Sequence, residues 1–185
     1  MKLYYATTKG QTDKHIEMLA TETIPSILKE AGHEVFTYIY NPADPSHELS
    51  FDTLLSAILN SDAFIGEMSR PSQTLGFQLA SALSASKPTL YLYNSARNGK
   101  PDVSISNNPS RLLRINEYET EASIKRVVAT FLKFADQQSR STRTSFISTK
   151  RIDEFITSQS KKLGISKGEA IRQLLDDAIT RNIEK

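Results

Sequence analysis

The fold is decided by the stretch Asp62-Ala63-Phe64-Ile65-Gly66-Glu67-Met68-Ser69-Arg70-Pro71-Ser72-Gln73-Thr74-Leu75-Gly76-Phe77-Gln78-Leu79-Ala80. Residues 63–66 form a short apolar run, as in a buried strand, and residues 74–85 have the apolar spacing of a helix. Ser72 stands just before this helix, where serine is a favoured N-cap. The stretch therefore predicts one strand–loop–helix unit.

The same alternation continues on both sides of this stretch. We expect Pro25 to interrupt the first flanking helix, Gly32 to end it, and Ser50 to cap the next one. Strands alternating with helices predict an α/β fold, a Rossmann-like parallel sheet of about five strands with helices on both faces. The further predicted strands are 2–6, 34–40, 88–93 and 111–115, and the further helices are 12–31, 51–60 and 119–135.

Composition excludes several classes of protein. The chain has no cysteine, which excludes disulfides, zinc–thiolate sites and thiol nucleophiles, and its three histidines are scattered. We therefore expect no metal site and no cofactor. No apolar run approaches a membrane span, and the N-terminus does not resemble a signal peptide, so we expect a cytoplasmic protein without membrane contact.

The charge is distributed unevenly along the chain. The formal net charge is +2, yet residues 1–138 carry 13 basic and 15 acidic side chains, whereas residues 139–185 carry 10 and 6. A basic C-terminal segment behind a slightly acidic domain is typical of a module that faces nucleic acid.

The stretch 62–80 resembles the core motif of the nucleoside 2-deoxyribosyltransferase superfamily, which includes the 2'-deoxynucleoside 5'-phosphate N-hydrolases. The motif reads roughly D-x-x-x-x-E-x-[ST]-x-P-S-x-G-x-G-x-E-L-[AG], and its last glutamate is the nucleophile that attacks the sugar. Gln78 stands at that position. Because an amide is a poor nucleophile and carries no negative charge, covalent and electrostatic help are both lost. The resemblance covers roughly residues 1–135.

The resemblance also implies a ligand site, and parallel sheets bind ligands beyond the carboxyl ends of their strands. Ser72 matches the serine that holds the 5'-phosphate, although it could only cap the helix. Tyr4 matches a tyrosine near the reacting sugar, although it could be a core aromatic. The expected ligand-binding residues are Tyr4, Thr7, Thr8, Lys9, Gly10, Ser72, Gly76 and Gln78.

Two other carboxylates could replace the missing nucleophile. Glu67 matches the first acid of the motif, although hydrogen bonding to neighbouring loop amides is the simpler role for it. The family also has a helper aspartate, which spacing to Asp62 places near Leu54 in this chain. The nearest carboxylate to that position is Asp52, about half a helical turn away.

The last 44 residues resemble a ribbon–helix–helix module. A predicted strand, 142–148, is followed by a helix, 150–163, the turn Gly164-Ile165-Ser166, and a second helix, 167–182. In that family the strands of two chains pair into a ribbon that enters the major groove of DNA. The unit is too small to bury a core alone, so we expect a homodimer or a higher even oligomer.

The resemblance implies DNA-binding positions in this module. They are Arg143 and Ser145, with Thr142 and Thr144 as the alternative register, and Ser166 and Lys167 at a helix N-terminus that can clamp phosphate. Dimerisation without DNA contact is the alternative.

These expectations combine into a domain order of 1–136, a linker at 137–141, and a module at 142–185. The favoured interpretation is a ligand-responsive transcriptional regulator whose partners are a nucleotide or nucleoside-like molecule and DNA. One alternative is an active deoxynucleoside or deoxynucleotide N-glycosidase or deoxyribosyltransferase. Another is an antitoxin-like protein whose N-terminal domain engages a protein partner.

Overall fold

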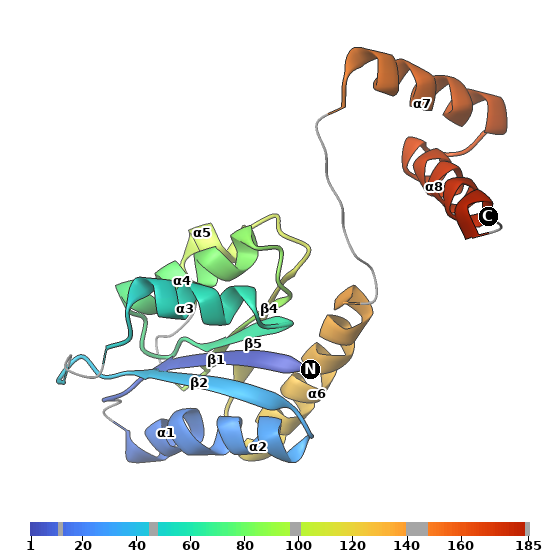
Figure 1. Cartoon of the computed structure of the whole chain (residues 1–185). Coiled ribbons are helices and arrows are strands. Elements are labelled where there is room, and N and C mark those ends of the chain that lie inside the picture. The colour runs from blue at the N-terminus through green and yellow to red at the C-terminus, as the bar shows by residue number, and fades with distance from the viewer. Residues whose placement is uncertain (11–12, 45–47, 97–100, 140–147, 184–185) are drawn as a thin grey trace. The chain divides into compact units, whose positions relative to one another are not determined.

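The chain divides into two compact units, Met1–Thr142 and Arg143–Lys185. The structure is a computed structural model, and it describes residues 1–10, 13–44, 48–96, 101–139 and 148–183 (Figure 1). The first unit holds the sheet with its flanking helices, and the second holds two helices.

The first unit is built on a five-stranded parallel sheet with the order β2-β1-β3-β4-β5. Because the chain winds outward in one direction from β1 to β2 and in the other from β1 to β3, the topological switch point lies between β1 and β3. The predicted α/β class and five-stranded sheet are confirmed. The strands are β1 Lys2–Thr8, β2 Glu34–Tyr40, β3 Ala63–Glu67, β4 Thr89–Asn94 and β5 Leu113–Tyr118.

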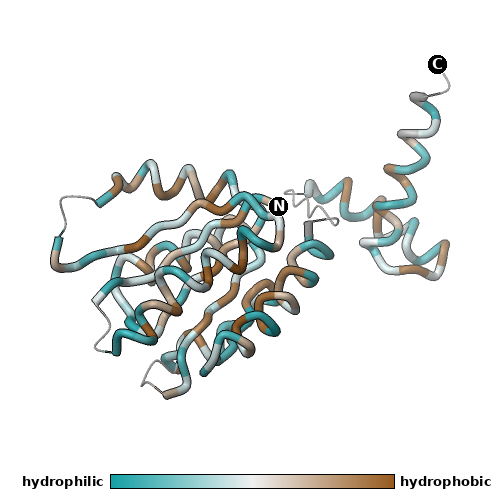
Figure 2. Tube along the Cα trace, turned by 90° about the horizontal axis from the view of Figure 1, so that it is seen from below, coloured by the Kyte–Doolittle hydropathy of each residue, from teal (hydrophilic) through white to brown (hydrophobic). Residues whose placement is uncertain are grey.

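Helices cover both faces of the sheet (Figure 1). The N-terminal helices and α6 enclose a core with Tyr5, Ile65 and Phe131, while α3 and α4 enclose the opposite core with Tyr4, Phe64 and Leu79. Figure 2 shows hydrophobic residues along the central strands, as expected for a sheet buried on both faces. The helices of this unit are α1 Lys14–Met18, α2 Ile24–Glu30, α3 Phe51–Leu59, α4 Gln73–Ser84, α5 Val103–Ser106 and α6 Glu121–Ser139.

The first predicted helix, 12–31, is divided by one wide turn. A π-helical segment, Leu19–Thr23, lies between α1 and α2 and ends just before Pro25. Proline has no backbone N–H and cannot donate a helical hydrogen bond. The change from the π-helical to the α-helical pattern occurs just before Pro25, where this donor is missing. Gly32 follows with a left-handed φ of 82°, as its predicted role at the helix end requires.

Two boundaries differ from those expected. The polar loop at 97–109 contains the short helix α5, because the Asp102 carboxylate accepts a hydrogen bond from the Ser104 amide (2.8 Å) and caps it. Helix α6 continues to Ser139, through residues expected to form a linker. Residues 137 and 138 are glutamines, which are polar but favour helices, so the helix continues through them.

The second unit contains α7, Lys150–Leu163, and α8, Lys167–Ile183, joined by a tight turn. Thr149 caps α7, and Gly164 ends it in the left-handed conformation with φ 67°. Ile156 and Ala170 are buried, whereas Phe155 and Leu175 are more than half exposed. The predicted ribbon strand, 142–148, lies outside the described residues except for Ser148, which is not in a strand.

The described residues contain neither a membrane-spanning helix nor a cluster of metal ligands. No helix there has the length and apolarity needed to cross a membrane. No group of three or more His, Cys, Asp or Glu side chains among those residues is arranged to hold a metal ion.

Candidate functional site

A buried carboxylate joins the strand ends at the carboxyl edge of the sheet. Glu67, the last residue of β3, is fully buried and accepts hydrogen bonds from the Thr7 hydroxyl (2.9 Å), the Ser69 amide (3.1 Å) and the Tyr118 hydroxyl (3.0 Å). The Ser69 hydroxyl also donates to Glu67 and accepts from the Asn94 amide (2.7 Å). The network therefore fastens the ends of β1, β3, β4 and β5 to one another.

Burial controls the protonation of this carboxyl group. Removal from water raises the pKa of Glu67, although the hydrogen bonds from Ser69, Thr7 and Tyr118 act in the opposite direction. The same burial raises the pKa of Tyr118 far above its ordinary value, with a further contribution from the Glu67 charge. Because its oxygens accept four hydrogen bonds in the interior, Glu67 supports the floor of the site and is not positioned as a free nucleophile.

Tyr4 and Gln78 form a second buried pair, at the inner side of α4. The Tyr4 hydroxyl donates to Gln78 Oε1 at 3.1 Å, and neither residue has measurable exposure to solvent. Burial, with a smaller contribution from Tyr38, raises the pKa of Tyr4 far above its ordinary value, so the phenol remains a donor. The residue at the nucleophile position of the motif therefore points into the domain.

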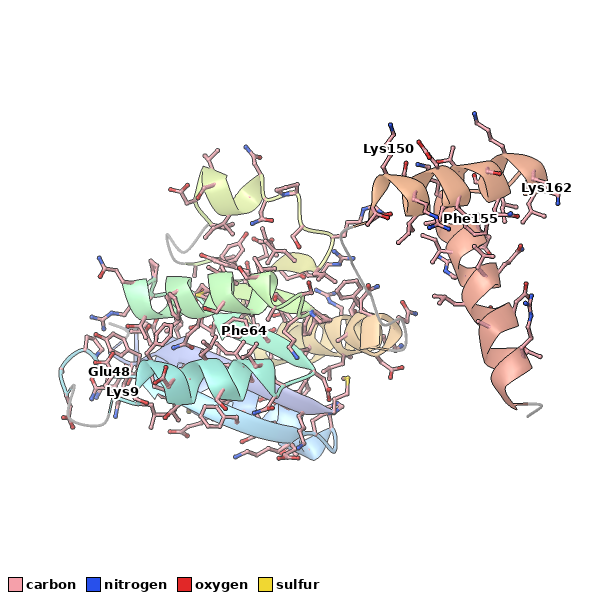
Figure 3. The ribbon with its side chains drawn as sticks, turned by 45° about the horizontal axis from the view of Figure 1, so that its top comes forward. Lys9, Glu48, Phe64, Lys150, Phe155 and Lys162 are labelled. Atoms are coloured by element: carbon pink, nitrogen blue, oxygen red, sulfur yellow. The ribbon has the colours of Figure 1, made fainter. Side chains whose placement is uncertain are left out.

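Aromatic stacking fixes the Tyr4 ring. Phe36 on β2 and Phe64 on β3 are its register partners and stack on it, with ring centroids at 5.1 and 5.5 Å. In Figure 3, Phe64 lies inside the domain. Because Phe36 and Phe64 hold the ring from both sides, the direction of the Tyr4 hydroxyl is fixed, and it points toward Gln78.

A cavity of about 310 Å³ lies beyond the ends of β1 and β2, against the loop between β3 and α4. Ser72 caps α4 by accepting from the Leu75 amide (3.2 Å), and Thr8 donates to the Ser72 hydroxyl (3.3 Å). The lining residues are Thr8, Tyr40, Pro42, Arg70, Pro71, Ser72, Gln73 and Thr74, with no carboxylate among them. A helix N-terminus with hydroxyls and a guanidinium suits a phosphate group.

Arg70 connects the two loops that border this cavity. Its Nη1 donates to the backbone oxygens of Lys9 (3.0 Å) and Gly10. Gly10 has a φ of 88°, and a Cβ added there would meet the Arg70 guanidinium. Arg70 was not among the predicted site residues, although its place just before Pro71-Ser72 could have indicated it.

The other predicted ligand residues lie at different depths. Thr7 is buried and engaged by Glu67, whereas Lys9 and Gly10 are exposed on the loop after β1. Figure 3 shows Lys9 at the same end of the sheet as Glu48. Gly76 is exposed on α4, and a Cβ added to it would meet no neighbour. The cavity therefore includes Thr8 and Ser72, while the Tyr4–Gln78 pair lies beneath the surface.

The helix before β3 has leucine, not a carboxylate, at the position expected for the helper aspartate. Leu54, at the position expected for a helper aspartate, is buried in the core shared by α3 and α4. Asp52 is exposed and lines a separate cavity of about 470 Å³ together with Phe36 and Asn60.

The residues expected to contact DNA lie partly outside the described residues. Arg143 and Ser145 fall there, as do the alternatives Thr142 and Thr144. Ser166 accepts from the Glu169 amide (3.2 Å) and so caps α8, and Lys167 forms an ion pair with Asp153 at 2.9 Å. DNA contact by this unit stays a prediction.

The fold and the cavity define a Rossmann-like α/β domain with a pocket lined by hydroxyl and guanidinium groups at the carboxyl edge of its sheet. No family model matches the chain. A 2'-deoxynucleoside 5'-phosphate N-hydrolase 1 of Methanosarcina barkeri is 32% identical over 118 residues, covering 57% of this chain and 69% of the relative. The protein of the same name from Methanosarcina mazei is 29% identical over 119 residues, with the same coverage.

Among solved structures, a CMP N-glycosidase from Clostridium botulinum, BcmB, matches 69% of this chain and 98% of its own with 16% identity and a TM-score of 0.49. This likeness is too distant to support an argument about function. The identity and coverage of the Methanosarcina barkeri relative show that the chain belongs to the 2'-deoxynucleoside 5'-phosphate N-hydrolase family.

This membership confirms the predicted superfamily and corrects the favoured function. The transcriptional regulator without turnover was inferred from Gln78 and from the basic C-terminal segment, and it was wrong. Both sequence relatives are named as hydrolases, which points to an enzyme.

Proposed function

We propose that this chain binds a nucleoside 5'-monophosphate and hydrolyses its N-glycosidic bond. The observation that carries the proposal is the cavity at the N-terminus of α4, with Ser72, Thr8 and Arg70 among its lining residues, in a chain of this family. The 5'-phosphate would lie in the cavity, and the sugar would extend toward Tyr4 and Gln78.

The chemistry differs from that of a family member with a nucleophilic glutamate. Without a carboxylate at position 78, no covalent sugar–enzyme intermediate forms there, so water attacks C1' directly as the C1'–N bond breaks. The water oxygen becomes the new hydroxyl of the sugar, and its proton leaves with the base. Gln78 Oε1 accepts from the Tyr4 hydroxyl, so this side chain supplies no negative charge to the positive charge that develops on the sugar.

The proposal is tested by incubating the full-length protein with each deoxynucleoside and ribonucleoside 5'-monophosphate and measuring free base by chromatography. Ser72→Ala with Thr8→Ala should weaken turnover of monophosphates, and the matched control is exposed Ser84→Ala at the other end of α4. Base release no faster than in buffer, for every monophosphate at high protein concentration, would overturn the proposal. Addition of a second free base distinguishes transfer from hydrolysis.

The C-terminal unit supports a second proposal, a module that pairs with its counterpart in another copy of the chain. Phe155, Ile152 and Leu175 are exposed apolar side chains on α7 and α8, and two short helices leave little core without a partner. In Figure 3, Phe155 lies between Lys150 and Lys162, which extend from the two ends of α7.

Light scattering on the full chain tests this pairing. A dimer or a higher even oligomer is expected for the wild type, and Phe155→Asp should reduce it, whereas Lys150→Gln should not. A monomeric wild-type chain at micromolar concentration would contradict the proposal. Pairing through the strand at 142–148 belongs to the same ribbon–helix–helix interpretation and stays a prediction.

A further inference from the structure

The outer surface of α3 and α4 carries almost no charge, although it is exposed. The two helices lie side by side on one face of the sheet (Figure 1). Across the nine residues of α3 and the twelve of α4, Asp52 is the only ionisable side chain, whereas α6 on the opposite face has five in 19 residues. Charged side chains normally occupy the solvent face of a helix. Their absence is typical of the core of a protein–protein interface.

Two exposed phenylalanines join the helices into one surface. Phe51 on α3 is 54% exposed and Phe77 on α4 is 42% exposed, and their ring centroids lie 4.8 Å apart. Leu59, 51% exposed, lies two turns further along the same side of α3 and extends the apolar area. Exposed apolar groups that cluster in this way mark interaction sites, and aromatic side chains are enriched there.

Small residues lie beside this aromatic pair on α4. Gly76 and Ala80 are both exposed and are one helical turn apart. Glycine destabilises a helix interior relative to alanine, and a Cβ at position 76 would meet no neighbour within 4 Å. The packing of the described residues therefore gives no reason for glycine here. A helix of another molecule that approaches α4 closely does.

We propose that these residues form a surface that pairs with its counterpart in a second copy of the chain. The surface, named the uncharged surface, consists of Phe51, Leu59, Gly76, Phe77 and Ala80. Nucleic acid and anionic membranes are poor partners for it, because both require basic side chains that it lacks. The pairing does not depend on the hydrolysis proposed above.

Symmetry explains why the absence of charge favours a second copy. Around a two-fold axis each side chain near the axis faces its own counterpart, so a charge there meets a like charge and opposes pairing. The uncharged surface avoids this repulsion. Asp52 also lies away from it, because this side chain lines a cavity with Phe36 on the β2 side of α3.

The size of the uncharged surface predicts weak pairing. Helix α4 is about 18 Å long, and two helices side by side are about 20 Å wide, which gives roughly 350 Å². This area is less than half of the ~800 Å² that each partner contributes to a standard interface. We therefore expect a dissociation constant of about 10–100 µM, as in a transient complex.

Sedimentation equilibrium of the full-length Phe155→Asp variant tests the pairing, because this background removes the association proposed for the C-terminal unit. Ala80→Glu should weaken dimerisation by about 100-fold or more, since the two-fold axis brings two new carboxylates together. Ala129→Glu is the matched control, an exposed alanine on α6, and should change nothing. Gly76→Ala should weaken dimerisation by about tenfold yet raise the Tm of the dilute chain, because alanine stabilises the helix.

Disulfide cross-linking gives a second measurement, because the chain has no cysteine of its own. Single cysteines at positions 76, 77, 80 and 84 scan the outer side of α4, with Ala129→Cys as the control. At least one of them should cross-link two chains about tenfold faster than the control, since pairing raises the effective thiol concentration.

The two measurements leave clear outcomes against the pairing. A Phe155→Asp chain that stays monomeric at about 200 µM would overturn it. So would equal effects of the two glutamate changes, or cross-linking no faster at any α4 position than at Ala129. Capture of a different protein by a monomeric chain would assign the surface to another partner and would equally reject a second copy. The cysteine scan decides the matter if Ala80→Glu fails to fold.

Discussion

Replacing Glu67 by alanine or by glutamine should have opposite consequences, although both changes remove the charge. Alanine leaves the Ser69 amide and the Tyr118 hydroxyl without the acceptor that now lies 3.1 and 3.0 Å from them. An unsatisfied buried donor costs roughly 1–3 kcal/mol, so two cost about 2–6 kcal/mol of unfolding free energy. Such a loss is a large fraction of the stability of an ordinary domain.

Glutamine can keep every contact. Its Oε1 accepts from Ser69 and Tyr118 as before, and its Nε2 donates to Thr7, whose hydroxyl then accepts instead of donating. The four contacts are kept and no charge is buried, while the Thr7 hydroxyl hydrogen and the second Nε2 hydrogen are the only donors that lose or lack an acceptor. At neutral pH we therefore expect Glu67→Gln to be at least as stable as the wild type.

The pH dependence follows from the raised pKa of Glu67. Between the ordinary value of 4.5 and the raised value, the folded chain binds more protons than the unfolded chain, so wild-type stability falls as pH rises through this window. The slope is at most about 1.4 kcal/mol per pH unit. Relative to wild type, Glu67→Gln should gain stability as pH rises from 4.5 through the raised pKa.

Urea unfolding of the full-length chain at pH 5, 6, 7 and 8, followed by circular dichroism, measures these differences. Glu34→Gln, an exposed glutamate on β2, is the matched control and should follow the wild type. If Glu67→Gln lost more than about 1 kcal/mol at pH 7, or if wild-type stability rose with pH relative to it, the reasoning would fail. The four donors would then hold the carboxylate ionised.

Three further changes test other parts of the structure. Gln78→Glu should raise the rate of base release by about 10²-fold or more in kcat/KM, because it restores a carboxylate at C1'; an unchanged rate would show that position 78 does not face the sugar. Ser72→Ala should cost about 1 kcal/mol of stability through the lost cap and weaken nucleoside monophosphates more than nucleosides; equal weakening of both would contradict a phosphate role. Gly164→Ala should lower the stability of the C-terminal helix pair by about 1 kcal/mol, because its φ of 67° is left-handed, and helix content during thermal unfolding measures it.

Patterns with a local physical cause were readable from the sequence. The strand at 34–40 and the Ser50 cap were predicted at the observed positions, because β-branched runs and helix caps depend on neighbouring residues. The interruption before Pro25 was also expected, although its π-helical form was not. Helix α6 is longer at its C-terminus than predicted, because polar residues alone do not end a helix.

The contacts of the site depend on residues far apart in the chain, and these could not be read in the same way. Glu67 was singled out, yet its hydrogen bond to Tyr118 joins residues 51 positions apart. The absence of an aspartate at the helper position, Leu54, could be predicted from sequence spacing. The burial of Gln78 against Tyr4 could not, because it depends on how α4 packs on β1. Sequence spacing singled out these residues, and tertiary packing determines which of their atoms remain available.

The pairing of Tyr4 with Gln78 also gives the protein an optical signal. The chain contains seven tyrosines and no tryptophan, so no indole absorption hides the phenol bands. Tyr4 is desolvated, stacked and hydrogen-bonded through its hydroxyl, whereas Tyr93 lies nearer to solvent. A ligand that draws the Gln78 amide toward itself alters the hydrogen bond of one buried phenol. Ultraviolet difference absorbance near the tyrosine band would then report occupancy of the sugar position without any label.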